Sequence, residues 1–145
     1  MTKLQKILTH YAALPYRIST EGLEILLVTS RESRRWILPK GRPEKKLLPY
    51  KVAELEAYEE AGVRGRVDHI ALGQYHSIKR LGLLGDRPVL ITVYALAVHT
   101  ILEAWPEQHE RERAWMTPDA AADAVRDREL AVLLRQFGVR QDQPE

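Results

Sequence analysis

The chain of 145 residues is 45% hydrophobic and 29% charged, a composition that suits one domain with a buried core and excludes wholesale disorder. Its formal net charge is only +2, so the charge does not indicate nucleic acid as a partner. It contains no cysteine, which excludes disulfide scaffolds, zinc–thiolate sites and cysteine nucleophiles, and which is typical of a reducing cytoplasm.

The sequence shows neither a signal peptide nor a membrane span. Residues 1–17 have no long apolar core and no small-residue cleavage signature. The longest apolar run, from Pro88 to Val98, is too short to cross a bilayer and is typical of a buried strand. We therefore expect a cytoplasmic protein without a membrane partner.

In chain order, the first half of the sequence predicts strands and then a helix. Residues 23–30 are aliphatic and β-branched, and we expect them to form a strand paired with residues 12–19. A short strand from Trp36 ends at Pro39, and a loop rich in proline and glycine follows. Pro49 suits the first turn of a helix and Gly62 suits the left-handed position after its last turn, which predicts a helix over residues 49–61.

The second half of the sequence predicts more strands and a C-terminal helical region. We expect a strand within residues 67–78, a loop over 79–88, a long strand over 89–102 and a short closing strand near 110–118. Residues 119–137 have charges at helical spacing and predict one or two helices ending at Gly138, followed by a frayed tail. Strands with interspersed helices indicate an α/β or α+β fold, with helices covering a mixed sheet.

Glutamates crowd the C-terminal end of the predicted helix. Glu56, Glu59 and Glu60 fall within an arc of about 100° on the helical wheel. Like charges at this spacing repel one another, and the helix dipole disfavours negative charge at this end. Two interpretations follow: a solvated acidic face, or a site in which a divalent cation supplies the missing positive charge. Mg²⁺ fits carboxylate oxygens best, and Mn²⁺ is the alternative ion.

The surrounding residues resemble a known family. The stretch from Gly41 to Val63, "GRPEKKLLPYKVAELEAYEEAGV", resembles the Nudix box, G-x5-E-x7-R-E-U-x-E-E-x-G-U, where U is a bulky aliphatic residue. The chain has leucine at two box positions, Leu47 in place of a glutamate and Leu55 in place of an arginine. The residues that match the box are Gly41, Glu56, Glu59, Glu60, Gly62 and Val63.

The resemblance extends over about residues 12–137. The later pattern "LEAWPE…RERAW" is similar to the Nudix branch that cleaves diphosphoinositol polyphosphates and diadenosine polyphosphates. The resemblance implies a single Nudix-like α/β/α sandwich domain over residues 1–145. It also implies an Mg²⁺-dependent hydrolase of a diphosphate linkage in a nucleoside-diphosphate-X, dinucleoside polyphosphate or diphosphoinositol-type substrate. The expected partner is this small phosphorylated substrate, and both a monomer and a homodimer stay open.

The resemblance also implies roles for individual residues. The metal ligands would be Glu56, Glu59 and Glu60, and Glu59 and Glu60 would also be catalytic. A late-loop glutamate is a further catalytic candidate, for which we choose Glu110, with Glu107 and Glu112 as alternatives. Phosphate contacts are expected from five basic residues, with Arg111 as the alternative to the last of them: Arg17, Arg31, Lys40, Arg42 and Arg113.

Other functions stay open at this point. Because Leu47 and Leu55 depart from the box, the chain could be a catalytically impaired module that binds a nucleotide or polyphosphate. If the resemblance is set aside, the chain could be a small interaction domain with an acidic helix face. The basic residues named above could equally be ordinary surface charges.

Overall fold

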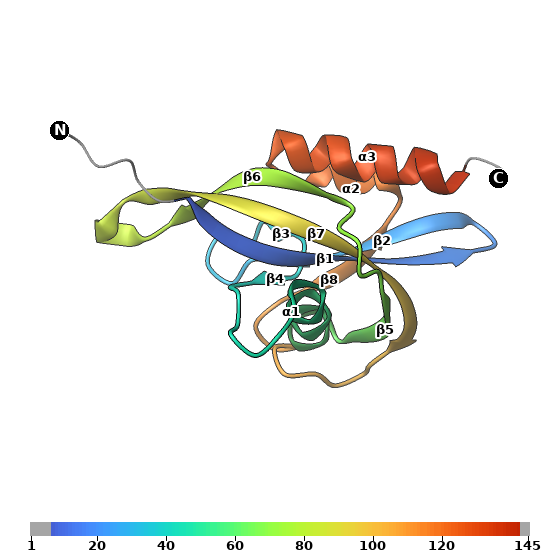
Figure 1. The fold of residues 1–145 in the computed structure, drawn as a ribbon. Helices are drawn as coiled ribbons and strands as arrows, with labels where there is room; N and C mark the ends of the chain where they lie inside the picture. The colour runs from blue at the N-terminus through green and yellow to red at the C-terminus, as the bar shows by residue number, and fades with distance from the viewer. Residues whose placement is uncertain (1–6, 143–145) are drawn as a thin grey trace.

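The computed structural model describes residues 7–142, which form a mixed sheet covered by helices on both faces (Figure 1). Helix α1 lies on one face and helices α2 and α3 on the other, as predicted for an α/β/α sandwich. The strands are β1 Leu8–Ser19, β2 Gly22–Thr29, β3 Trp36–Ile37, β4 Lys40–Gly41, β5 Val63–Val67, β6 Gly73–Arg80, β7 Asp86–Ile101 and β8 Arg113–Met116.

The sheet has the order β3-β2-β1-β7-β5, with β4 beside β1, β6 beside β7 and β8 beside β2. Only the pairing of β1 with β7 is parallel among the ladders of the described residues. Aliphatic side chains alternate along β2 between the two faces, so that Ile25 and Leu27 face α3 while Leu26 and Val28 face α1. Both faces are therefore buried, which explains the continuous aliphatic run in this strand.

Helix α1 begins at Pro49 and continues to Glu56, and η1, a single π-helical segment over Ala57–Ala61, completes it. Gly62 follows in the left-handed conformation, with φ of 65°, so the predicted extent of the helix is confirmed. The π winding was not predicted. Such segments are frequent at functional sites because they shift side chains relative to a regular helix.

The hairpin of β6 and β7 is longer than predicted. Residues predicted as a loop pair across the two strands, with Lys79 opposite Arg87 and Arg80 opposite Asp86. Residues 81–85 remain at the tip, and they contain the turn η2, Gly82–Leu84. The strand predicted within residues 67–78 corresponds to β6, which begins only at Gly73. Val67 belongs to β5, and residues 68–72 form the connection between the two strands.

The C-terminal region forms two helices, α2 Pro118–Ala124 and α3 Arg128–Asp142. The prediction that the helix ends at Gly138 is wrong. A Cβ at Gly138 would lie 2.7 Å from Pro118 Cβ, so this glycine allows two helices to approach closely and does not end one. Residues 139–142 of the predicted frayed tail are helical, and residues 143–145 lie outside the described residues.

Strand β4 brings the loop after Pro39 against helix α1. The backbone N–H of Ala13 donates to the carbonyl of Pro39 at 3.0 Å, and Gly41 lies opposite Tyr11 of β1. This short strand holds the first glycine of the box beside the glutamates of α1. Across residues 7–142, no helix has the length and apolar character needed to cross a membrane.

Candidate active site

The carboxylates of Glu56 and Glu60 lie against the backbone of strand β4. A Cβ added to Gly41 would lie 2.5 Å from the carboxyl carbon of Glu56, so a glycine is needed for this carboxylate to pack here. The backbone N–H of Lys40 donates to Glu60 Oε1 at 3.3 Å. Gly41 and Glu56 are therefore side by side, and Glu60 contacts the adjacent backbone, although fifteen or more positions separate these glutamates from Gly41 in sequence.

A polar hollow of about 610 Å³ opens in front of these carboxylates. Its wall carries both acidic and basic side chains. Its lining residues are Glu44, Glu56, Glu59, Glu60 and Glu107 on the acidic side, His10, Arg31, Lys40, Arg42, Lys79 and Arg111 on the basic side, and Gly41 and Pro43.

Burial raises the pKa values of the glutamates on the acidic side of the hollow. Desolvation and the hydrogen bond with Glu56 raise the pKa of Glu60 to about 9, although nearby Arg111 opposes the shift. Desolvation also raises the pKa of Glu56, although its hydrogen bond with Glu60 opposes the shift. Desolvation raises the pKa of Glu59 as well, and Glu107 and Glu44 add to this effect. Without a bound cation, the carboxyl of Glu60 is therefore protonated at neutral pH.

The donor set fits a hard divalent cation. Carboxylate oxygens are the ligands that Mg²⁺ prefers, and a cation binding here would displace the proton of Glu60. Within residues 7–142, no three His, Cys, Asp or Glu side chains already stand in the arrangement of ligands around one ion. The glutamates would therefore have to reorient as the ion binds.

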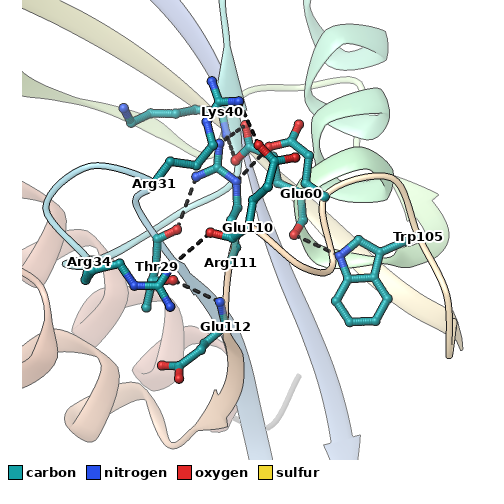
Figure 2. A network of polar contacts seen from close by, with 10 residues as sticks. Thr29, Arg31, Arg34, Lys40, Glu60, Trp105, Glu110, Arg111 and Glu112 are labelled. Carbon is teal, nitrogen blue, oxygen red and sulfur yellow. Dashed lines mark hydrogen bonds and ion pairs between the residues drawn. The ribbon is translucent and has the colours of Figure 1, made fainter.

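Arg111 is the cation nearest to this pair. Its guanidinium is almost fully buried, 3.5 Å from Glu60 Oε2 and 2.9 Å from Glu107 Oε1. It also donates to the carbonyl of Thr29 at 3.1 Å, which fixes it to the end of β2 (Figure 2). Sequence reasoning kept Arg111 as an alternative only, because the contacts that bury it join residues 82 positions apart.

The basic side contains two residues that sequence reasoning missed, His10 and Lys79. His10 is buried, and its Nδ1 has no hydrogen-bond partner among the described residues. Burial, together with the charges of Lys40, Lys79 and Arg42, lowers the pKa of His10 to about 4. Burial also lowers the pKa of Lys40, although Glu60 opposes the shift. His10 lies on a strand that was expected to begin later, and Lys79 was assigned to a loop, so no sequence signal marked either.

Three predicted site residues do not line the hollow. Arg17 pairs with Glu24 at 2.9 Å and lies over the ring of Trp115. Glu110 pairs with Arg31 at 3.2 Å in an exposed position, whereas Glu107 of the same loop reaches the hollow.

Arg113, the third of these residues, is bound to backbone. It donates to the carbonyls of Ala61 at 2.9 Å and Leu102 at 2.7 Å, and it lies over the ring of Trp105. The two departures from the box, Leu47 and Leu55, are half-buried and are not part of the wall of the hollow either.

Comparison with known proteins agrees with the resemblance found in the sequence. The profile of the NUDIX domain matches residues 8–137. Nudix hydrolase 18, mitochondrial, from Arabidopsis thaliana is 36% identical over 122 residues, which are 79% of this chain and 66% of that protein. Diphosphoinositol polyphosphate phosphohydrolase 3-beta from Homo sapiens is 34% identical over 112 residues, 76% of this chain and 64% of that protein. The chain thus spans just under two thirds of the length of each relative.

Among solved structures, Ap4A hydrolase from C. elegans superposes with a TM-score of 0.66 at 17% identity, covering 94% of this chain and 99% of that one. At this identity the likeness shows the fold. It confirms the predicted Nudix-like α/β/α sandwich. The relatives named as hydrolases support the prediction of a pyrophosphohydrolase.

Proposed function

Because the chain belongs to the NUDIX domain family, we propose that it is an Mg²⁺-dependent hydrolase that cleaves a diphosphate linkage in a polyphosphorylated small molecule. The observation that carries this proposal is the polar hollow, in which a carboxylate set suited to a cation faces a basic wall suited to phosphate. A solvated acidic face would not need buried glutamates whose pKa values are raised by desolvation.

We assign separate roles in cation binding and phosphate binding to the residues of the hollow. Glu56 and Glu60 would hold Mg²⁺, with Glu59 at the edge of the same set. When bound, Mg²⁺ would offset charge on the transferring phosphoryl group and lower the pKa of a bound water. Lys40, Arg42 and Arg31 would bind and orient the phosphates, and the nearly buried Arg111 would hold the side chains of Glu60 and Glu107 in place.

A general base must lie within reach of the attacking water and have a pKa near the working pH. Glu59 is half-buried, lines the hollow and has a raised pKa, so it is our candidate. Glu107 is the late-loop alternative, because it lines the hollow and Glu110 does not. Glu110 would act on Arg31, with which it pairs.

The basic wall favours a substrate with negative charge beyond the diphosphate that is cleaved. Lys79 adds a further positive charge to the wall that contains Arg31, Lys40, Arg42 and Arg111, which suits a chain or ring of several phosphates. We therefore propose a dinucleoside polyphosphate or a diphosphoinositol-type compound, and a nucleoside-diphosphate-X with a neutral X as the less favoured substrate. The names of the human and C. elegans proteins described above agree with this choice.

The decisive test is a panel of diphosphate compounds incubated with the full chain and Mg²⁺ or Mn²⁺, with release of phosphate or nucleotide as the readout. We expect turnover that EDTA abolishes. Glu60→Gln should lower kcat by about 10³-fold or more, because it removes a ligand charge without changing side-chain size. Absence of turnover across the panel with metal-saturated protein would contradict the proposal.

A second candidate is a module that binds a polyphosphate without cleaving it. The observation in its favour is the pair of departures from the box, Leu47 and Leu55. It predicts that a polyphosphate raises the Tm while no product forms. Leu55→Arg separates the two candidates: a rise in rate of about tenfold or more would identify an impaired enzyme, and retained binding without turnover would identify the module.

The remaining sequence predictions enter the proposal unchanged. We propose a single domain over residues 1–145, of which residues 1–6 and 143–145 lie outside the described part. A cytoplasmic location and the choice between monomer and homodimer stay predictions. Size-exclusion chromatography with light scattering would decide the oligomeric state.

A further inference from the structure

The C-terminal end of the glutamate helix is capped by a distant loop. The last carbonyls of a helix have no partner within the helix and need donors from elsewhere. Here the donors come from residues 102–113. The backbone N–H of Glu107 donates to the carbonyl of Glu59 at 3.0 Å, and that of Leu102 donates to the carbonyl of Gly62 at 2.8 Å.

Two side chains complete the cap, Trp105 from this loop and Arg113 from the start of β8. The indole N–H of Trp105 donates to the carbonyl of Glu60 at 3.2 Å (Figure 2). Arg113 donates through Nη1 to the carbonyl of Ala61 at 2.9 Å and to that of Gly62 at 3.3 Å. A guanidinium at this end also offsets the negative end of the helix dipole.

Trp105 and Arg113 act as one unit, which we call the Trp105–Arg113 clamp. The guanidinium carbon of Arg113 lies 3.8 Å from the centroid of the Trp105 ring. Gly62 fits directly beneath the clamp: a Cβ there would lie 2.5 Å from the Trp105 ring and 2.7 Å from Arg113 Nη1. The unit therefore fits closely around the backbone that follows Glu60.

The clamp binds the backbone of Glu60, whose side chain lines the hollow. Trp105 fixes the backbone carbonyl of Glu60, while the Lys40 N–H and Arg111 approach its carboxylate from the other end of the side chain. A π-helical segment needs outside support because it departs from the regular helical ladder. A small rotation of this segment would move the carboxylates of Glu59 and Glu60 out of the hollow.

We propose that the Trp105–Arg113 clamp is a positioning device that sets the geometry of Glu59 and Glu60 for cation binding. Arg113 is then a positioning residue, since both of its Nη atoms donate to backbone carbonyls and it does not line the hollow. This inference rests on the proposed function, because it assigns the clamp to the same cation site.

Two conservative variants of the full chain test the clamp. Trp105→Phe removes the indole N–H but keeps an aromatic ring, and Arg113→Lys keeps the charge but loses the fork that reaches separate carbonyls. The probe is Mg²⁺ alone, measured by isothermal titration calorimetry, with a thermal melt of each protein. The matched control is Arg135→Lys, which alters ion pairs with Asp119 and Asp123 on the opposite layer of the fold.

We expect the Kd for Mg²⁺ to rise by about tenfold in Trp105→Phe and in Arg113→Lys, and by less than twofold in Arg135→Lys. Equal Kd values in wild type and both clamp variants, with only a lower Tm, would show that the clamp merely stabilises the fold and would overturn this inference alone. A folded wild-type chain that binds no Mg²⁺ would overturn the inference together with the proposed metal-dependent function.

Discussion

The contact between Gly41 and Glu56 gives a sharp prediction for the variant Gly41→Ala. The added Cβ would lie 2.5 Å from Cδ and Oε1 of Glu56 and 2.9 Å from its Cγ. Carbon atoms in ordinary contact are about 3.5–4.0 Å apart, so the carboxylate must move by about 1 Å. The φ angle of Gly41 lies outside the left-handed region, so backbone strain does not enter the comparison.

This displacement should affect function far more than stability. Overpacking of a rigid core costs about 1–3 kcal/mol, but the obstacle here is the end of a flexible side chain beside an open hollow. We expect a loss in the free energy of unfolding below about 1 kcal/mol and a Tm change within about 4 °C. A misplacement of about 1 Å in a catalytic group can lower the rate by about 10²-fold, equivalent to about 2.7 kcal/mol in the activation free energy.

The assay measures kcat/KM on whichever panel substrate the wild type cleaves, together with the Kd for Mg²⁺ and the Tm. Gly73→Ala is the matched control, because its Cβ would lie 3.0 Å from a movable methyl of Leu133 and far from the glutamates in the fold. We expect the control to stay within about twofold of wild type. If Gly41→Ala kept kcat/KM within about threefold of wild type, the idea that Gly41 seats the Glu56 carboxylate would be refuted.

Two further predictions concern the basic wall. Burial lowers the pKa of His10 to about 4, so the folded state keeps it neutral while the unfolded chain takes up a proton below about pH 6.5. The free energy of unfolding should be unaffected by His10 above pH 7, and His10 should lower it by about 2–3 kcal/mol between pH 6.5 and 4. Urea unfolding across this pH range should show the decrease in the wild type but not in His10→Gln. The same pH dependence in both proteins would contradict the prediction. Lys79→Ala should raise KM for a polyphosphate substrate about tenfold with little change in kcat, because Lys79 lines the hollow. Arg80 is exposed on the same strand and does not line the hollow, so Arg80→Ala should change KM by less than twofold. Equal effects of the two variants on KM would contradict a specific role for Lys79 in binding phosphate.

The local parts of this fold were predictable from short stretches of sequence. Pro49 and Gly62 mark the two ends of the glutamate helix because each imposes its own backbone conformation. The spacing of Glu56, Glu59 and Glu60 puts their side chains on one arc of any helix that contains them. The π winding was not predicted, and the donors that cap the end of this segment come from residues 102–113, far from it in sequence.

Roles for the basic residues were harder to predict, because many lysines and arginines have the same local character. Arg111 and Arg113 are two positions apart in sequence, so a regular extended segment would place their side chains on the same side. Residues 111–112 precede β8 and are not part of a strand, and the two side chains have different surroundings. One contacts Glu60 and Glu107 in the hollow, and the other contacts the backbone carbonyls at the helix end. No property of either arginine in the sequence distinguishes these two positions.

The sequence by itself determined the helix, the buried strands and the set of carboxylates, because each depends on interactions among residues a few positions apart. Only the tertiary structure decided which side chains face those carboxylates. His10 and Lys79 meet there because β1 and β6 both pair with β7, and Arg111 meets them because its loop binds the end of β2. These contacts depend on the register of long-range strand pairing, which the local pattern of residues does not specify.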